Sequence, residues 1–255
     1  MRRGILITRP EPGLGETMRA VAAMGLEPIA CPMLDIRARM PRLPAAGFLQ
    51  AILLTSGQAV APLAEATASD TGLRRLPLFS VGDATAARAR AAGFTEVVSA
   101  AGDAVDLAVL VRARQPPGAA LLLVTGEGQG ALLAQSLRRS GYRLHRRVLY
   151  EAKPTVALSA AGLAALRSER LAACLFFSAG TARNFERRCP VSSHRSLGAV
   201  RALAISPAVG EALAGLPWQS VEITAHPDTG SMLSLLRRIV PTQPEPEDVH
   251  AGDSP

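Results

Sequence analysis

The sequence predicts an α/β protein with parallel sheets, built from two homologous halves. A-I-L-L-T-S-G-Q-A-V (51–60) is echoed by C-L-F-F-S-A-G-T-A-R (174–183), and each is an apolar run that ends in a hydroxyl and small residues. Apolar runs of this length are typical of buried parallel strands. Two further blocks repeat in the same register, which indicates an internal duplication. The matched pairs are 79–93 with 204–215 and 98–110 with 223–236.

Length and composition agree with two α/β domains. At 255 residues the chain is long enough for two domains of ordinary size. Hydrophobic residues make up 48% of it and aromatic residues only 4%, so the cores must consist mainly of Ala, Leu and Val. Strands that alternate with alanine-rich helices favour parallel sheets covered by helices.

The first unit shows how each element is predicted. Gly4–Thr8 is a short apolar strand, and the loop R-P-E-P-G that follows cannot be helical because of its prolines. A helix at 14–24 comes next, closed by Gly25 where glycine is favoured, and then a strand at 26–33.

Later units repeat this order. Strand, glycine-rich turn, helix and strand recur at 120–150, and a connection that contains a helix is expected at 154–168. The acidic, proline-rich tail 241–255 has almost nothing to bury and is expected to be disordered. Four units alternate along the chain, at 5–34, 51–112, 121–150 and 174–238.

The chain is basic, with a formal net charge of +7, and Lys153 is its only lysine. Arginine-rich codon usage explains this charge, and so does an anionic partner, because arginine pairs bidentately with carboxylate and phosphate. Basic and aromatic residues are not interleaved, so no nucleic-acid partner is expected. No apolar run approaches a membrane span and no signal segment is visible, so we expect a cytoplasmic protein without membrane contact.

Metal and disulfide chemistry are not expected. Cys31, Cys174 and Cys189 form no C-x-x-C pair, which indicates a reducing compartment, and the histidines are scattered. The sequence shows no zinc-ligand pattern, catalytic triad motif or paired-carboxylate motif.

Six predicted strands end in turns made largely of Gly, Ser, Thr and Pro. In parallel sheets such turns lie at the carboxyl edge, where ligands bind. Their free N–H groups attract anions, and small residues let the backbone approach a ligand closely. We therefore expect these turns to bind a polyanion, although each alone could be an ordinary tight turn. They are 8–10, 55–57, 81–83, 125–127, 178–180 and 205–207.

Other candidate residues leave alternatives open. Gly126–Ala131 fits the dinucleotide fingerprint G-x-G-x-x-[GA], with Glu151 further on, but the duplicate unit lacks the pattern. A nucleotide-dependent enzyme is thus the less favoured alternative. Tyr150 is either a half-buried strand residue with a solvated hydroxyl, or a proton donor or orienting hydrogen-bond donor at a domain junction. Asp83 and Asp103 are expected as helix-start and capping residues rather than catalytic acids.

Several motifs occur in a fixed order from about Ile5 to Leu236. They are I-T-R-P, L-T-S-G-Q-A-V, S-V-G-D-A-T-A, V-T-G-E-G-Q-G-A-L-L-A-Q-S-L-R-R-S-G, V-L-Y-E, F-F-S-A-G-T-A-R-N-F and A-H-P-D-T-G-S-M-L-S-L-L. Each motif alone is weak, but their order and spacing together resemble those of the uroporphyrinogen-III synthase family.

This resemblance implies two flavodoxin-like, doubly wound domains joined by a two-stranded linker near 33–38 and 148–153. The first domain would be discontinuous, with the second inserted into it and the active site in a cleft between the two. The implied boundaries are 1–35 plus 153–240 for the first domain and 36–152 for the second.

The implied reaction is that of a cyclising lyase. Hydroxymethylbilane, a linear tetrapyrrole with eight carboxylates, would lose water and close to uroporphyrinogen III with inversion of ring D. No cofactor is implied. The resemblance further implies a monomer in the cytoplasm, with a transient contact to the preceding pathway enzyme. The alternative is a non-catalytic paralogue that binds a tetrapyrrole or another polyanion.

The resemblance also carries over site residues. Tyr150 matches a tyrosine proposed to assist departure of hydroxide. Thr125, Gln58, Ser206 and Val209 depart from the family pattern, and Val209 removes a hydroxyl expected to face the substrate. The expected substrate-binding residues are Arg9, Ser56, Gly57, Gly82, Thr85, Gly126, Ser178, Ala179 and Ser206.

Overall fold

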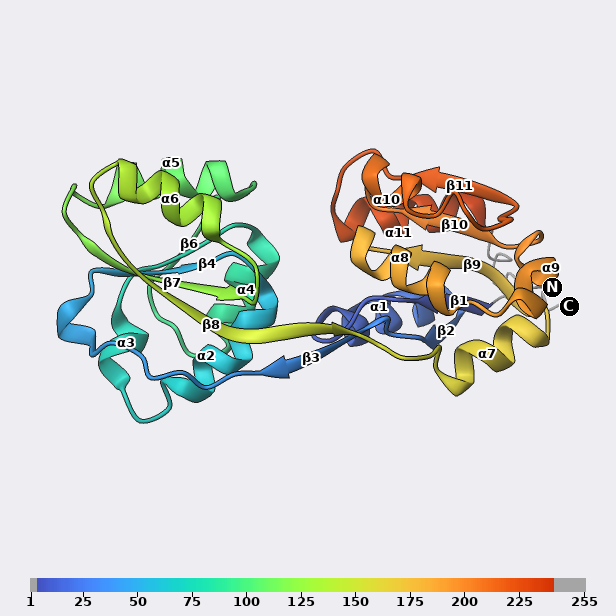
Figure 1. Cartoon of the computed structure of the whole chain (residues 1–255), viewed down its shortest axis with the longest axis horizontal. Coiled ribbons are helices and arrows are strands. Elements are labelled where there is room, and N and C mark those ends of the chain that lie inside the picture. Colours follow the sequence, from blue (N-terminus) through green and yellow to red (C-terminus); the bar gives the residue numbers. More distant parts are fainter. Residues whose placement is uncertain (1–3, 241–255) are drawn as a thin grey trace, which may run out of the picture. The chain divides into compact units, whose positions relative to one another are not determined.

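A computed structural model describes residues 4–240 of the protein, which divide into two compact units (Figure 1). The first unit contains the chain up to Asp35 and from Pro154 onward, and the second contains Ile36–Lys153. The tail 241–255, which the sequence predicts to be disordered, lies outside the described residues.

The first unit is built on a five-stranded sheet in the order β11-β10-β9-β1-β2. All of its strand pairs are parallel. Every residue of β1 and β9 is buried, as expected for central strands that are covered on both faces. The strands are β1 (Gly4–Ile7), β2 (Glu27–Ala30), β9 (Leu171–Phe176), β10 (Arg201–Ala204) and β11 (Ser220–Ile223).

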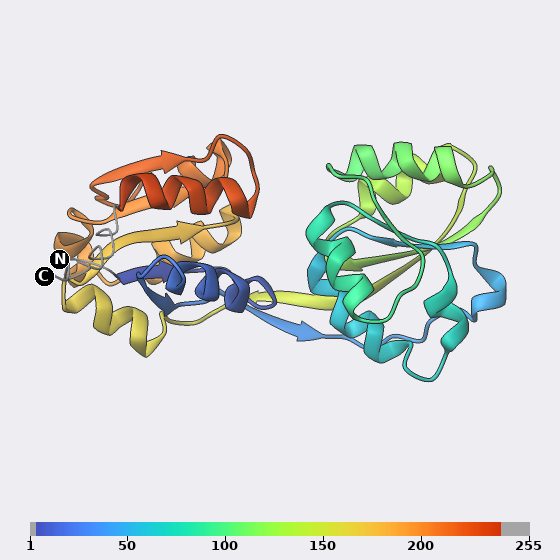
Figure 2. The same cartoon turned by 180° about the vertical axis from the view of Figure 1, so that it is seen from behind.

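Helices cover both faces of this sheet. Figure 2 shows α1 (Gly13–Ala22) beside α11 (Thr229–Ile239), and both helices contribute to one apolar cluster. Helices on the other face pack around Phe176 and Phe185, whose ring centroids are 5.3 Å apart. These elements are α7 (Ala160–Arg167), α8 (Ala179–Arg188), η3 (Val191–Ser193), α9 (His194–Leu197) and α10 (Pro207–Glu211).

The second unit is built on a six-stranded sheet in the order β3-β8-β7-β4-β5-β6. The strands from β8 to β6 pair in parallel. β4, β5 and β7 are buried throughout. The strands are β3 (Leu34–Ala38), β4 (Ala51–Leu54), β5 (Leu78–Ser80), β6 (Val97–Ser99), β7 (Ala120–Gly126) and β8 (Arg143–Pro154).

This second sheet also has an apolar cluster on each face. One cluster contains residues of α2, α3 and α4, and the other contains residues of α5 and α6. Leu, Ala and Val make up most of both clusters, as the low aromatic content requires. The elements are η1 (Ala46–Phe48), η2 (Gly57–Ala59), α2 (Val60–Ala66), α3 (Thr71–Arg75), α4 (Asp83–Ala91), α5 (Ala104–Arg114) and α6 (Ala131–Arg139).

β3 is paired with the second half of β8. The Arg39 N–H donates to the Leu149 carbonyl at 2.7 Å, and the Thr155 N–H donates to the Met33 carbonyl at 3.2 Å. The two strands therefore run in opposite directions. The first half of β8 extends beyond β3, and the non-strand segment 40–45 follows β3 there.

The predicted mixed α/β fold with parallel sheets is confirmed. Asp83 begins α4, and Asp103 caps α5 in a reciprocal capping box, as the sequence predicts. The strand predicted at 26–33 is shorter, because β2 ends at Ala30. The Cys31 N–H still donates to the Ile7 carbonyl and the Met33 N–H to the Thr8 carbonyl, but the donors step by two residues while the acceptors step by one, so the regular parallel ladder ends here.

Candidate active site

Three predicted turns of the second unit follow adjacent strands. The order β5-β4-β7-β8 places their carboxyl ends in one row. Ser56 caps η2 by accepting the Gln58 N–H at 3.2 Å, and Gly82 is the N-cap of α4. Gly57 has no side chain, and the Arg88 guanidinium occupies the space that a Cβ would need. The expected residues in this row are Gly82, Thr85, Ser56, Gly57, Gly126 and Tyr150.

Thr85 lies in the first turn of α4. Its N–H donates to the Gly82 carbonyl at 3.1 Å, and the residue is only 8% exposed. A backbone hydrogen bond therefore fixes this turn, and Gly82 is more exposed to solvent than Thr85.

Tyr150 packs directly onto the turn that follows β7. It is 3% exposed, and its hydroxyl donates to Oε1 of Gln129 at 3.0 Å. A Cβ at Gly126 would come within 2.6 Å of Cζ of the tyrosine ring, so only glycine allows this contact. The Glu127 N–H donates to the Tyr150 carbonyl at 2.9 Å. Tyr150 is therefore buried and bonded to the turn rather than half-buried with a solvated hydroxyl.

An ionic cluster holds the same turn from outside. Nη2 of Arg39 lies 3.0 Å from Glu127 and 2.7 Å from Glu151, and Lys153 lies 3.1 Å from Glu151. The hydrogen bonds from Arg39 and then from Lys153 hold the pKa of Glu151 below its usual range. Arg39 thus ties the end of β3 both to the turn after β7 and to β8.

The expected residues of the first unit also follow adjacent strands. The order β10-β9-β1 places Ser206, Ser178 with Ala179, and Arg9 after neighbouring strand ends. Ser178 caps α8 by accepting the Thr181 N–H at 3.2 Å, and Ala179 is the first residue of that helix. Ser206 is the N-cap of α10 without a side-chain capping bond, and Pro207 follows it.

Arg9 is fixed by contacts on both sides. Its Nη1 donates to Oγ1 of Thr17 at 3.3 Å and to Oγ1 of Thr229 at 3.2 Å. Its Cζ lies 4.2 Å above the centroid of the Phe177 ring, a cation–π arrangement. These contacts join β1 to the starts of α1 and α11 and preset the direction of the guanidinium.

Val209 does not present its side chain to a ligand. It is 3% exposed and belongs to the apolar cluster that includes Phe176 and Phe185. A hydroxyl at this position would face the core of the first unit. This differs from the expectation that the position faces the substrate.

The described cysteines are not nucleophiles in this structure. Cys31, Cys174 and Cys189 lie in one apolar cluster, and burial raises the pKa of each thiol, that of Cys189 to about 11. They therefore stay protonated near neutral pH. Across residues 4–240, no group of three or more His, Cys, Asp or Glu side chains is arranged to hold a metal ion.

The comparisons with known proteins decide the family. A family model described as uroporphyrinogen-III synthase HemD matches residues 15–234. The chain belongs to the uroporphyrinogen-III synthase family. It is accordingly a cyclising lyase of tetrapyrrole synthesis. No curated protein matches it.

Solved synthase structures share the fold. The uroporphyrinogen-III synthetase of Helicobacter pylori is 17% identical with a TM-score of 0.62, and the match covers 93% of this chain and all of that one. A mutant uroporphyrinogen III synthase of Thermus thermophilus is 20% identical with a TM-score of 0.51, over 92% and 98% of the two chains. At these identities the likeness extends to the fold alone.

Local packing explains the glycine motif of this synthase without a nucleotide. Gly126 accommodates the Tyr150 ring, and Gly130, with φ of 76°, leaves room for the Thr125 methyl group. Gly128 has φ of 72°, in the left-handed region that favours glycine. Glu151, the acidic residue of the fingerprint, is held by Arg39 and Lys153.

Four residues beside the predicted site were missed from the sequence. Gln129 lies within a quoted motif, so it could have been considered as a partner for Tyr150. Phe177 also lies within a quoted motif, but its contact with Arg9 depends on strand pairing. Arg39 and Arg88 carry no sequence signal, because their roles depend on strand pairing and helix packing. No helix within residues 4–240 is long and apolar enough to cross a membrane.

Proposed function

We propose that this synthase binds the carboxylates of hydroxymethylbilane at the turns of both units. There it closes the chain to uroporphyrinogen III with inversion of ring D and loss of water. The family match over residues 15–234 is the observation that supports this reaction. The rows of capped turns after β10-β9-β1 and β5-β4-β7-β8 support the choice of residues.

Binding would rest on backbone N–H groups and arginine. The first amides of α8 have no partner within the helix, and the helix dipole favours an anion at Ser178 and Ala179. Arg9 adds a guanidinium already directed by Thr17 and Thr229. Ser56, Gly57, Gly82 and Gly126 offer small residues that allow close approach of the backbone.

Catalysis would consist mainly of imposing a conformation. The bilane also closes without an enzyme, to the isomer in which ring D is not inverted. Holding its carboxylates fixed favours the closure that inverts the ring, and this needs orientation more than a strong acid or base. A site without a catalytic triad is consistent with that requirement.

Tyr150 would assist the departing hydroxide. Its hydroxyl donates to Gln129 at 3.0 Å, and Gln129 is exposed, so the donor can turn from the amide oxygen to a leaving oxygen. Ring packing against Gly126 keeps the phenol in place during this exchange. The role is that of one hydrogen bond to the leaving group.

We also propose that the two units are flavodoxin-like products of a duplication, with β3 and β8 as linker. The first unit has the strand order 2-1-3-4-5, which is the flavodoxin-like order. The five parallel strands of the second unit have the same order when β7 and β8 are counted before β4, β5 and β6. The paired strands β3 and β8 lie at the unit boundaries. We further expect a cytoplasmic monomer that needs no cofactor and that meets the preceding pathway enzyme transiently.

The deciding experiment feeds purified protein with freshly generated hydroxymethylbilane and separates the uroporphyrin isomers after oxidation. Isomer III in excess, in proportion to the protein concentration, supports the synthase. Isomer I alone, at the spontaneous rate, would instead leave the non-catalytic tetrapyrrole-binding alternative.

A further inference from the structure

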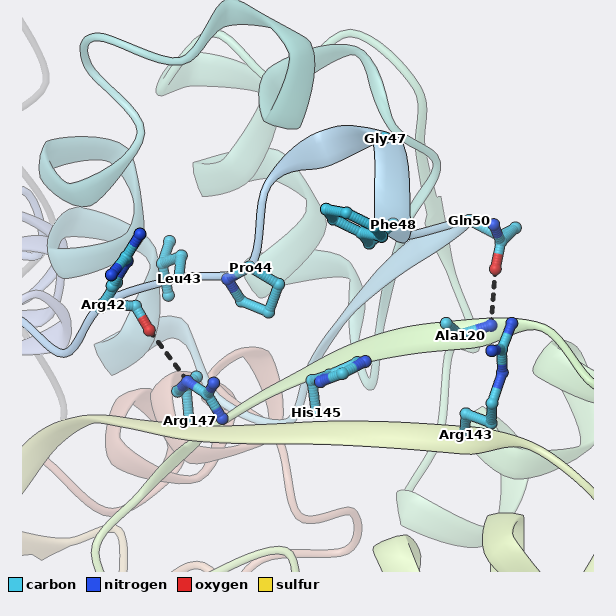
Figure 3. Close-up of a pocket in the computed structure, with 10 residues that line it drawn as sticks. All are labelled: Arg42, Leu43, Pro44, Gly47, Phe48, Gln50, Ala120, Arg143, His145 and Arg147. Atoms are coloured by element: carbon cyan, nitrogen blue, oxygen red, sulfur yellow. Dashed lines mark hydrogen bonds between the residues drawn. The ribbon is translucent and has the colours of Figure 1, made fainter.

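A second basic region lies at the opposite edge of the sheet in the second unit (Figure 3). A cavity of about 580 Å³ opens between β8 and the segment that includes η1. This volume is in the range of small-molecule sites. Its lining residues are Arg42, Leu43, Pro44, Gly47, Phe48, Gln50, Ala120, Arg143, His145 and Arg147.

The cavity is separate from the predicted substrate turns. Ala120 and Arg143 are the first residues of β7 and β8, whereas Gly126 and Tyr150 lie toward the other ends of the same strands. The length of β7 alone corresponds to roughly 20 Å. The cavity therefore faces the amino edge of the parallel strands, and the turns face the carboxyl edge.

Basic side chains line one wall of the cavity. Arg143, His145 and Arg147 alternate along β8 and so project from the same face, which Figure 3 shows directed toward the segment that includes Phe48. None of the ten described residues that line the cavity is acidic. No carboxylate among residues 4–240 pairs with Arg42, Arg143 or Arg147. A bound anion would supply the counter-charge that these guanidinium groups lack.

Backbone carbonyls orient two of these guanidinium groups. Arg147 donates from Nε to the Arg42 carbonyl and from Nη1 to the Arg146 carbonyl, each at 3.0 Å. Arg143 donates from Nε to the Gly118 carbonyl at 3.1 Å. The remaining N–H groups form planar forks that suit a carboxylate or a phosphate.

The opposite wall carries apolar side chains beside Arg42. Phe48 is 73% exposed, and it lies near Leu43 and Pro44 (Figure 3). An exposed phenyl ring facing a row of basic side chains offers a stacking surface for a flat ring that carries anionic groups. Convergent charges on one wall and apolar side chains on the other are typical of a ligand site.

We propose that this cavity binds a small aromatic polyanion, with two or three carboxylate or phosphate groups held by Arg42, Arg143 and Arg147 and its ring against Phe48. The site is additional to the synthase turns and does not depend on the synthase reaction. The cavity would recognise a small molecule by its anionic groups and its aromatic ring together.

Calorimetric titration of the full chain tests this with three probes. Benzene-1,3,5-tricarboxylate carries ring and carboxylates, citrate carries carboxylates without a ring, and inorganic pyrophosphate carries phosphates. We expect saturable binding of the tricarboxylate, weakened at least tenfold in Arg42→Glu and Arg143→Glu. Phe48→Ala should weaken the tricarboxylate and leave citrate unchanged. Tighter binding of pyrophosphate than citrate would support phosphate as the natural anion, and the reverse would support carboxylate.

The matched control is Arg112→Glu, which reverses an exposed charge on α5 away from the cavity. It should change the affinity less than twofold. Absence of saturable binding would overturn the proposal, and so would equal weakening by Arg112→Glu. Unchanged affinity in Arg42→Glu would place the probe elsewhere and also overturn it. Isomer III formation by Arg42→Glu should equal that of the wild type, so failure here and failure of the synthase proposal are distinguishable.

Discussion

Replacing Tyr150 by phenylalanine separates its two contributions, packing and hydrogen bonding. The ring remains against Gly126, and only the bond to Gln129 is lost. Since Gln129 is exposed, water can replace the lost donor, and the free energy of unfolding should fall by only about 0.5 kcal/mol. If the hydroxyl contributes one neutral hydrogen bond, worth about 1 kcal/mol, to the departing hydroxide, turnover should fall about fivefold.

The structure offers a matched control for this measurement. Tyr142, the other tyrosine, is in the same unit, is 4% exposed and donates to the Gln115 carbonyl at 2.9 Å. Tyr142→Phe should lose a similar hydrogen bond and leave the rate of isomer III formation unchanged. Equal turnover in the two variants would refute the role of Tyr150. A loss of a thousandfold would also contradict the reasoning, because it would make Tyr150 an indispensable general acid.

Three further substitutions test the packing and the charges of the site. Gly126→Ala places a Cβ 2.6 Å from the Tyr150 ring and should lower the free energy of unfolding in urea by about 1–3 kcal/mol, with a loss of turnover. Val209→Thr buries a hydroxyl in an apolar cluster and should lower the free energy of unfolding by about 1–3 kcal/mol. A higher yield of isomer III in this variant would contradict the core position of the side chain. Glu151→Gln removes a carboxylate whose pKa is lowered by Arg39, so wild type should melt above the variant at pH 7. This difference in melting temperature should disappear as the pH falls below about 4, where the carboxylate becomes protonated. A difference that grows on acidification would exclude the ion pair with Arg39 as its source.

Local signals explain most of what the sequence predicted. Strand ends, the start of α4 at Asp83 and the capping box of α5 depend on residues within a few positions of one another. The buried strands are apolar runs because helices cover both faces of their sheets. Such features are visible without knowing which strands pair.

The remaining site contacts depend on which strands are neighbours. Gln129 meets Tyr150 only because β7 pairs with β8, and Arg39 reaches Glu151 only because β3 lies beside β8. The cavity over β8 was missed for the same reason. The alternation of Arg143, His145 and Arg147 is visible in the sequence, but the segment that faces it is distant along the chain.

Three of the four departures from the family pattern have a local structural context. Val209 faces the core, so a hydroxyl there would not meet a ligand on the outer side of α10. Ser206 keeps a small residue at the N-cap position. Thr125 lacks the guanidinium expected at its position, but Nε of Arg146 on β8 lies 3.5 Å from its hydroxyl. A neighbouring strand thus brings an arginine to the position where the motif itself has none.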